Sequence, residues 1–419
     1  MKIAFLTLGC KLNYAETSTY ERGFREAALE VVPWRDKADV YLVNTCSVTA
    51  MSDSKSRNLI RKVHRVNPDA AIVVTGCSAQ LRRAEIEAIE GVRLVFGCTQ
   101  KSRVVPDTLA LLGIAHSAAD EGCIAADEDI FPAYSTGERT RSFLKVQDGC
   151  NNYCKYCTVP YARGESRNVP VCVLVKQAAA IAAQGVKEIV LTGVNTGDFG
   201  RSTNESFLDL LKALNGVDGI ERYRISSIEP NLITEEIIDW IASGTKFQPH
   251  FHIPLQTGSD ELLSRMGRHY DTAFFRNRIE YIRRAMEAPG KPKVFFGIDL
   301  MVGLPGETEE LFAKTCAFLE EIRPAFIHVF PYSRRPGTPA AGMSGQVEES
   351  EKNRRVAVLE EMCTRFHSEF VESNRGIKEK VLFESTDRNG RMEGYTGNYI
   401  RIEREYDPAL SGKIVDVVI

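Results

Sequence analysis

The sequence predicts an α/β protein with an N-terminal doubly wound parallel-sheet domain, a central partial (β/α)6 barrel and a small C-terminal β-barrel. Three observations lead to this fold class. Apolar runs alternate with polar, periodic stretches of helical length over most of the chain. The 419 residues exceed the usual size of one domain. Residues 375–419 change to short strand-like runs separated by turn residues.

Four apolar runs, each followed by a helical stretch, predict a parallel sheet in the first domain, over 1–118. These runs are Ile3–Leu8, Val40–Val43, Ala71–Val74 and Arg93–Phe96. Each run ends close to a cysteine, and the four cysteines are Cys10, Cys46, Cys77 and Cys98. Because the carboxyl ends of parallel strands lie along one edge of a sheet, these cysteines can converge. A linker is predicted over 119–138.

Six βα repeats predict the barrel, over 139–345, with an active site at the carboxyl ends of its strands. The expected strands are Phe143–Val146, Glu188–Leu191, Arg224–Ser227, Phe251–Leu255, Val294–Leu300 and Ala325–Phe330. The expected helices are Val173–Gln184, Thr234–Ser243, Phe274–Glu287 and Glu307–Ile322.

The end of the chain predicts one helix and then a small antiparallel domain. Apolar residues recur at helical spacing over 346–374, which indicates an amphipathic helix that lies on the barrel. The domain over 375–419 is expected to contain the strands Val381–Ser385, Gly394–Ile402 and Lys413–Ile419, with a turn at Arg388–Gly390.

Composition excludes several classes of protein. Hydrophobic residues make up 43% and charged residues 26%, which excludes global disorder. Lys and Arg number 53 against 56 Asp and Glu, so any nucleic-acid site must be a local patch. No apolar segment is long enough for a signal peptide or a membrane span, so we expect a cytoplasmic protein without a membrane partner. The eleven cysteines favour metal binding over disulfides.

The strongest chemical signal is the sequence GCNNYCKYC, in which Cys150, Cys154 and Cys157 follow a predicted strand. Three thiolates on one short loop can hold three irons of a [4Fe–4S] cluster and leave the fourth iron open. A closed zinc site would need a fourth ligand, and no further Cys or His follows within the loop.

This triplet, at the end of the first barrel strand, resembles that of the radical S-adenosylmethionine enzymes. The resemblance implies that Cys150, Cys154 and Cys157 are catalytic and that the open iron binds S-adenosylmethionine. It also implies that Tyr156 lies against the adenine. The other implied cofactor-binding residues lie at strand ends and are Thr192, Gly193, Asn195, Ser226, Glu229, Gln256 and Gly303.

Over nearly the whole chain the order of domains resembles the methylthiotransferases. That resemblance implies a second [4Fe–4S] cluster on Cys10, Cys46 and Cys77, and two S-adenosylmethionine molecules per turnover. One molecule would yield the radical that removes a substrate hydrogen, and the other would supply the methyl group. Cys98 departs from the family pattern, and we interpret it as a packing residue, because a cluster with four thiolates has no free iron to carry sulfur. We interpret the remaining cysteines, Cys123, Cys172, Cys316 and Cys363, as packing residues too.

The residues after the first cysteine, Cys-Lys-Leu-Asn, resemble the bacterial enzymes that convert N6-threonylcarbamoyladenosine, next to the anticodon of tRNA, to its 2-methylthio derivative. That modification carries a carboxylate, for which an arginine is a suitable partner. The candidates are Arg163, Arg167, Arg334 and Arg335. Alternatives are an enzyme acting on isopentenyladenosine in tRNA or on a ribosomal protein, and a non-catalytic iron–sulfur or zinc RNA-binding protein.

The C-terminal domain resembles the TRAM module, an RNA-binding β-barrel. The implied RNA-contacting residues are Arg388, Arg391, Tyr399 and Arg401. A second basic stretch follows Cys46 on a predicted helix and contains Lys55, Arg57, Arg61, Lys62 and Arg65. The implied partners are tRNA and a low-potential electron donor such as flavodoxin or ferredoxin, and we expect a monomer.

Overall fold

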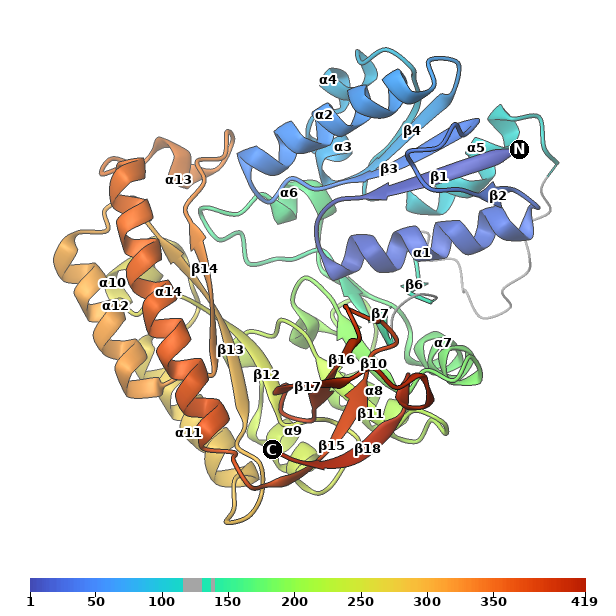
Figure 1. Ribbon diagram of the computed structural model, residues 1–419. Helices are drawn as coiled ribbons and strands as arrows, with labels where there is room; N and C mark the ends of the chain where they lie inside the picture. Colours follow the sequence, from blue (N-terminus) through green and yellow to red (C-terminus); the bar gives the residue numbers. More distant parts are fainter. Residues whose placement is uncertain (116–129, 137–139) are drawn as a thin grey trace.

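The structure is a computed structural model that describes residues 1–115, 130–136 and 140–419. It contains an N-terminal parallel sheet, a central barrel-like arc of strands and a C-terminal antiparallel sheet, which together confirm the predicted fold class (Figure 1). Most of the predicted linker, and Cys123 within it, lie outside the described residues. No helix in the described ranges is both long and apolar enough to cross a membrane.

The N-terminal sheet is parallel and has the order β2-β1-β3-β4-β5. Its strands are β1 (Lys2–Thr7), β2 (Glu30–Val31), β3 (Val40–Thr45), β4 (Ala71–Gly76) and β5 (Val92–Phe96). Helices cover both faces and are α1 (Lys11–Glu26), α2 (Ala50–Val66), α3 (Cys77–Leu81), α4 (Arg83–Glu87) and α5 (Val104–Leu111). Alternate residues of β3 enter two separate cores, because Tyr41 packs with α2 whereas Leu42 packs with α1 and α5. The sheet is therefore doubly wound.

The barrel strands form two sheets, β11-β10-β7-β6 and β12-β13-β14. They are β6 (Ala133–Tyr134), β7 (Arg141–Lys145), β10 (Glu188–Thr192), β11 (Arg222–Ile225), β12 (His250–Gln256), β13 (Phe295–Val302) and β14 (Phe326–Pro331). Backbone hydrogen bonds from Tyr223 to Lys246 and from Ile228 to His252 join β11 to the chain around β12. All six predicted strands are present, and only β6 runs antiparallel to its neighbour. A short antiparallel pair, β8 (Gln147–Asp148) and β9 (Arg167–Asn168), brackets the cysteine loop.

Helices cover the outer surface of the arc, and several begin where a side chain caps the first turn. Ser206 and Asp209 form a capping box, and Thr234, Asp271 and Thr308 each accept a hydrogen bond from a first-turn N–H. The helices are α6 (Val159–Arg163), α7 (Val171–Ala183), α8 (Phe207–Asn215), α9 (Glu235–Ala242), α10 (Asp260–Arg265), α11 (Thr272–Met286), α12 (Glu309–Ile322) and α13 (Pro339–Gly342). One large apolar core fills the space between the strands and these helices.

The predicted amphipathic helix is α14 (Glu349–Glu372), which packs on β14 through Leu359, Met362 and Phe366. It leads into the antiparallel sheet β17-β16-β15-β18, in which β17 and β18 remain the two edges. These strands are β15 (Lys378–Phe383), β16 (Arg391–Thr396), β17 (Arg401–Glu405) and β18 (Ile414–Val418). Arginines of β11 hold this sheet, because Arg222 donates to the Tyr395 carbonyl at 3.0 Å and Arg224 to the Gly397 carbonyl at 2.7 Å.

One predicted strand of this sheet is wrong. Gly394–Ile402 is divided into β16 and β17 by a turn in which Tyr399 has a φ of 67°. The Thr396 hydroxyl accepts from the Ile400 N–H at 2.8 Å and thereby closes the turn. By contrast, the predicted turn at Arg388–Gly390 is present, with left-handed backbone at Asn389 and Gly390.

Candidate active site

The cysteine triplet lies on a tightly held loop after β8. Gly149 makes this loop possible, because its φ is 75° and a Cβ there would overlap the backbone oxygen of Glu165. The Cys150 N–H donates to the Gly164 carbonyl at 3.1 Å, and the Lys155 N–H donates to the Met266 carbonyl at 3.0 Å. Backbone bonds on both sides therefore hold the three cysteines in place.

The three thiols suit an iron–sulfur cluster. Cys154 is buried, and the other two are half-buried. Burial raises the pKa of Cys150 to about 11 and that of Cys157 to about 12, so without metal both thiols stay protonated at neutral pH. Hydrogen bonds reach the sulfurs from Arg268 Nη1 to Cys154 at 3.1 Å and from the Val159 N–H to Cys157 at 3.4 Å. Such donors stabilise metal-bound thiolates.

Sequence reasoning missed Arg268, a buried arginine that links the triplet to β11. It forms an ion pair with Glu229 at 2.6 Å and hydrogen-bonds the hydroxyl of Tyr270. Glu229 was a predicted cofactor residue, and the structure places it beside the triplet through this arginine. A basic residue in the sequence GRHY gives no signal of such a role, because the partner lies far away in the chain.

The predicted S-adenosylmethionine residues from the second and third strands also lie together. The Gln147 side chain accepts from the N–H groups of Val194 and Asn195 at 2.9 and 3.0 Å, and the Asn195 side-chain oxygen Oδ1 accepts from the Glu229 N–H. Asn195 Nδ2 and Ser226 Oγ are buried atoms without a hydrogen-bond partner among the described residues. Because a buried polar group without a partner is costly, these two atoms fit a site for a polar ligand.

The other predicted cofactor residues lie at the strand ends in varied surroundings. Tyr156 packs beside Met266 and Leu304, and Thr192 donates to the Val190 carbonyl. Gln256 has a left-handed φ of 72°, at the end of β12. Gly303 donates its N–H to the Glu307 carboxylate, and the Lys352 side chain lies where a Cβ would stand. Their contact with a cofactor stays a prediction.

The N-terminal cysteines Cys10, Cys46 and Cys77 lie at the ends of β1, β3 and β4. Gly9, with a φ of 106°, packs against Cys46 so closely that a Cβ would lie 2.9 Å from the cysteine Cβ. Burial, and then the charges of Cys77 and Cys10, raise the pKa of Cys46 to about 11. Three thiols close enough to influence one another fit a second cluster as a donor set.

Cys98 is buried at 2% exposure and packs against Cys77 and Ala162. A hydrogen bond from the Cys77 thiol lowers the pKa of Cys98 to about 6. Ala162 belongs to α6, which begins just after Cys157, so one short helix connects the two cysteine groups. Of the other described cysteines, Cys363 is buried and Cys316 packs against the same core. Cys172 is exposed, so its interpretation as a packing residue is wrong.

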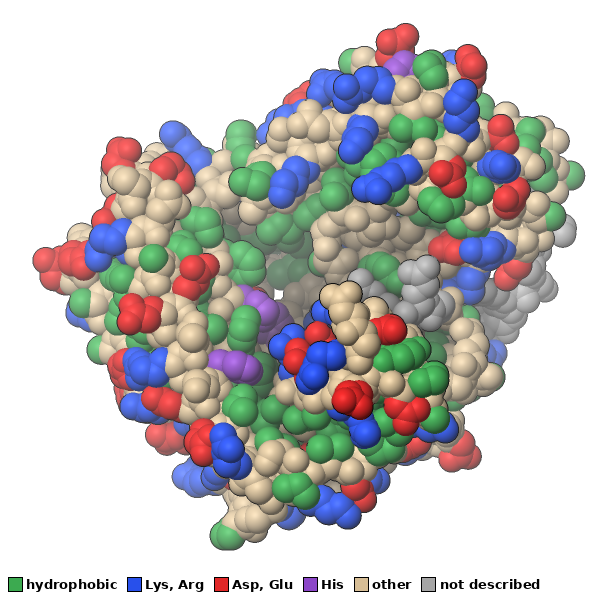
Figure 2. Space-filling model, viewed as in Figure 1, with side chains coloured by type: hydrophobic (Ala, Val, Ile, Leu, Met, Phe, Trp, Pro, Cys, Tyr) green, Lys and Arg blue, Asp and Glu red, His purple; other side chains and the backbone are tan. Residues whose placement is uncertain are grey.

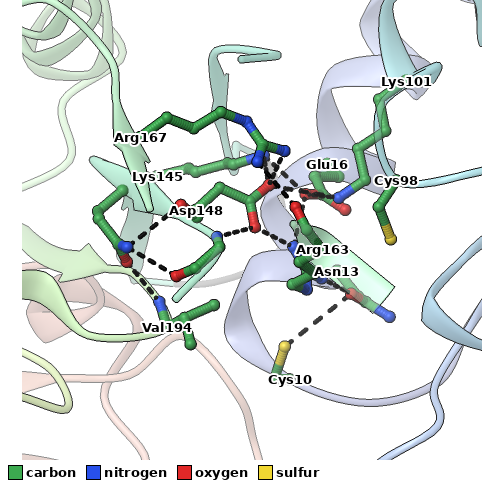
Figure 3. Close-up of polar contacts among 12 residues, drawn as sticks. Cys10, Asn13, Glu16, Cys98, Lys101, Lys145, Asp148, Arg163, Arg167 and Val194 are labelled. Carbon is green, nitrogen blue, oxygen red and sulfur yellow. Dashed lines mark hydrogen bonds and ion pairs between the residues drawn. The ribbon is translucent and has the colours of Figure 1, made fainter. Parts of the chain in front are cut away.

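A buried network of charges joins the N-terminal domain to the barrel (Figure 3). Glu16 of α1 pairs with Lys101 and, at 2.9 Å, with Lys145 of β7. Asp148 pairs with Lys145 at 2.6 Å and with Arg163 of α6 at 2.8 Å. Burial opposes ionisation of Glu16, but the cations outweigh burial and lower the pKa of Glu16 to about 2.

Arg163 is central to this network, and the structure corrects its predicted role. Its guanidinium donates to Asp148 and, at 2.7 Å, to Asn13, which lies 3.9 Å from the Cys10 sulfur. Only 2% of Arg163 is exposed, so it has no contact left for a substrate carboxylate.

The other three predicted carboxylate partners are also engaged elsewhere. Arg167 donates to the carbonyls of Arg163 and Glu165. Arg334 donates to the Ala341 carbonyl, and Arg335 forms a buried ion pair with Asp53 of α2. None of the four arginines lines the cavity described next.

A cavity of about 650 Å³ lies where the N-terminal domain, the barrel interior and the C-terminal sheet meet. The hollow is visible in Figure 2, with histidine side chains at its edge. Gly9, Cys10 and Lys11 line it from the first domain, and Tyr399 and Arg401 line it from the last. Val190 and Ile225 line it just before the predicted cofactor residues Thr192 and Ser226. The cavity therefore brings an N-terminal cysteine to barrel strands that end in predicted cofactor residues.

The four predicted RNA-contacting residues of the C-terminal domain all contact other side chains of the protein. Tyr399 stacks on Tyr395 and accepts a hydrogen bond from Arg141, so it is not a free platform for a base. Arg388 and Arg401 share Glu393, and Arg391 lies 3.8 Å from Glu403, so carboxylates offset their charges. In the other predicted basic stretch, on α2, four side chains are exposed: Lys55, Arg61, Lys62 and Arg65.

Comparison with known proteins places these features in context. Residues 2–97 match a family described as uncharacterized protein family UPF0004, and residues 144–319 match the radical SAM superfamily. The threonylcarbamoyladenosine tRNA methylthiotransferase MtaB of Bacillus subtilis is 39% identical over 100% of this chain and 93% of its own length. A tRNA-2-methylthio-N(6)-dimethylallyladenosine synthase of Geobacter metallireducens is 32% identical over 98% of this chain and 94% of its own length.

A solved structure provides a further likeness. The radical S-adenosylmethionine methyltransferase TsrM of Kitasatospora setae superposes with a TM-score of 0.57 over 81% of this chain and 77% of that one. The two sequences are 15% identical, so this likeness concerns the fold alone.

Proposed function

Because this chain belongs to the radical S-adenosylmethionine methylthiotransferases, we propose that it converts N6-threonylcarbamoyladenosine in tRNA, next to the anticodon, to its 2-methylthio derivative. The observation that carries this proposal is the cavity that Cys10 and the barrel strands line together. Cys10 lines it from one side, and the strands that end in the predicted S-adenosylmethionine residues line it from the other. A target base held there would lie between a sulfur source and a radical source.

The family implies an iron–sulfur cluster and S-adenosylmethionine, and the matched N-terminal family suggests a second cluster. We propose Cys150, Cys154 and Cys157 as ligands of the first, and Cys10, Cys46 and Cys77 as ligands of the second. When bound, the two clusters would supply, respectively, the electron that cleaves S-adenosylmethionine and the sulfur that is transferred with a methyl group. Two S-adenosylmethionine molecules per turnover follow from that chemistry.

Side chains of the protein fix the positions of the two cysteine groups and of the predicted cofactor residues. Asn13 and Arg163 connect the Cys10 end of α1 to Asp148, which lies two residues before Cys150. Gln147 positions the turn at Val194 and Asn195, and Arg268 connects Glu229 to the Cys154 sulfur. All these contacts are buried or partly buried, so they are themselves shielded from water.

The full-length match to an MtaB enzyme supports tRNA as the partner and threonylcarbamoyladenosine as the target. Action on isopentenyladenosine remains the alternative, since a dimethylallyladenosine synthase also matches along the whole chain. A low-potential electron donor such as flavodoxin or ferredoxin is required by the proposed chemistry. A tRNA substrate supports a cytoplasmic location, and a monomeric state stays a prediction.

The experiment that tests this function uses the full chain, reconstituted anaerobically with iron and sulfide. It should hold about eight irons and methylthiolate tRNA that bears threonylcarbamoyladenosine, but not tRNA that bears isopentenyladenosine. Mass spectrometry of the digested tRNA measures the product. Two triple variants are matched controls: replacing Cys150, Cys154 and Cys157 with Ala should halve the iron and abolish 5′-deoxyadenosine formation.

Replacing Cys10, Cys46 and Cys77 with Ala should also halve the iron but preserve 5′-deoxyadenosine formation. Equal turnover of both tRNAs would contradict the proposed substrate while leaving the chemistry intact. Stoichiometric zinc without iron would favour the non-catalytic alternative and overturn the enzymatic one.

A further inference from the structure

The described residues that line the cavity include several cations but no carboxylate. Its charged or titratable nitrogen-bearing side chains are Lys11, Arg141, Arg224, Arg401 and four histidines, at 250, 252, 328 and 367. Among the described residues that line it, none is Asp or Glu. A concave, partly apolar site of one sign favours an anionic ligand, because low-dielectric walls strengthen the field inside it.

The three arginines of the lining are already engaged. Arg141 pairs with Glu384 at 2.8 Å and donates to the Tyr399 hydroxyl at 3.0 Å. Arg224 pairs with Glu188 at 2.9 Å and, like Arg222, holds backbone carbonyls of the C-terminal sheet. Arg401 pairs with Glu403 at 2.8 Å. The Arg141 and Arg224 guanidinium groups attach the C-terminal sheet to the barrel, whereas Arg401 is paired within that sheet.

Lys11 is different, because its side chain makes no hydrogen bond or ion pair with any described residue. Asp299 is the carboxylate whose charge acts on it, and Asp299 is itself bonded to His252 at 2.7 Å. Lys11 directly follows Cys10 and is the first residue of α1, whose first turn contains no acidic residue. Its ammonium is therefore an unpaired cation beside Cys10, a proposed ligand of the cluster that would supply the sulfur.

We infer that the Lys11 ammonium binds the carboxylate of the threonylcarbamoyl group and thereby selects that substrate. This inference rests on the proposed function and makes it specific. The four arginines favoured by sequence are engaged outside the cavity, whereas Lys11 lies inside it, next to Cys10. An apolar isopentenyl group in the same place would leave the ammonium desolvated and unpaired, which the site would disfavour.

The test is a double-mutant cycle between protein and RNA. The reconstituted enzyme, without reductant so that no turnover occurs, is titrated with an anticodon stem-loop RNA that bears either threonylcarbamoyladenosine or its carboxamide analogue. The wild-type chain should bind the acid about 30-fold more tightly than the amide, as expected for a charge pair removed from water. Lys11→Met should bind both RNAs equally, and Lys11→Arg should restore part of the preference.

Two controls keep the result interpretable. Iron and sulfide content must be unchanged in Lys11→Met, since Cys10 is its neighbour. Lys37→Met, at an exposed lysine of the same domain, should keep the full preference for the acid. A preference for the acid that persists in Lys11→Met would overturn the inference, and so would an equal loss of affinity for both RNAs, which would indicate a phosphate contact. A wild-type enzyme without any preference for the acid would overturn the inference too, whereas failure of the proposed substrate would show separately, as turnover of tRNA that bears isopentenyladenosine.

Discussion

At the scale of single residues, the surroundings of Cys98 bear on its interpretation as a packing residue. It is buried and hydrogen-bonded to Cys77, one of the proposed ligands. Its backbone N–H donates to Gln80, which fixes it at the edge of the sheet. A thiol in contact with a ligand is not thereby a ligand. A cluster that must transfer sulfur needs one iron without a protein thiolate.

We therefore expect Cys98→Ala to retain the full iron content of the reconstituted chain. Removal of one buried sulfur should lower the free energy of unfolding by about 1 kcal/mol. Cys363→Ala, at a buried cysteine of α14 in the core of the barrel, is the matched control and should cost a similar amount. Iron analysis and thermal unfolding measure the two effects. Loss of half the iron in Cys98→Ala alone would identify it as a fourth ligand.

Residues whose role follows from their spacing within one short segment could be predicted from sequence. Residues whose role depends on distant partners could not. The Cys150 triplet depends on three positions of one loop. Arg268 and Lys11, by contrast, gain their importance from partners on distant strands. Arg163 misled for the same reason: an arginine just after the triplet suggests substrate binding, but its partners Asp148 and Asn13 come from two different domains.

At the scale of elements, the strands and helices of the α/β parts follow from hydrophobic periodicity. All ten predicted α/β strands are present, with ends shifted by a residue or two. The error in the C-terminal sheet arose because the residues on both sides of the turn at Thr396–Ile400 are apolar enough to resemble one continuous strand. The turn is specified by Asn398 and Thr396, which hydrogen-bond each other at 2.7 Å. Such side-chain contacts compete with strand pairing and are not visible in the hydrophobic pattern.

The loop that carries the triplet depends on one glycine, and this leads to a prediction. Gly149→Ala should cost several kcal/mol and remove about half the iron, because the new methyl group meets the Glu165 carbonyl that closes the loop. Gly185→Ala is the matched control: its φ is 82°, but nothing lies within 4 Å of a Cβ there. It should lower the free energy of unfolding by only about 1–2 kcal/mol, because alanine is strained in left-handed backbone. Denaturant unfolding and iron analysis measure the two effects. Equal free energies of unfolding and equal iron contents in the two variants would contradict the role given to this contact.

At the scale of the whole molecule, the buried network of Figure 3 determines how the first domain sits on the barrel. Glu16 and Asp148 together face four cations, which are Lys101, Lys145, Arg163 and Arg167. Lys101 and Arg163 both act to lower the pKa of the proposed ligand Cys77, but the hydrogen bond to Cys98 and burial keep that pKa well above its ordinary value. The network therefore aligns the domains and offsets part of the effect that burial has on this thiol.

Glu16→Gln should destabilise the chain by about 3–5 kcal/mol, because it leaves buried cations uncompensated. Glu21→Gln, one and a half turns further along α1, removes an exposed ion pair with Arg25 and should cost well under 1 kcal/mol. Because the folded pKa of Glu16 is depressed to about 2, its contribution is present above pH 4.5 and is lost as the pH falls towards 2. Thermal unfolding at pH 7 and at pH 3 measures both effects. Equal stability of the two variants at pH 7 would show that the network does not hold the domains together.

The cavity lies inside the barrel, among residues of strand interiors such as Val190 and Gly297, and this position constrains the RNA. A nucleotide stacked within an anticodon loop cannot bring its ring to these strand interiors. In the proposed reaction, the adenosine is therefore extruded from its neighbours before it reaches Cys10, at a cost of about a few kcal/mol in lost stacking. Loop nucleotides lack a Watson–Crick partner, so their extrusion costs less free energy than that of a paired base. Selection of the target thus begins with how easily a base unstacks, before any group on it is recognised.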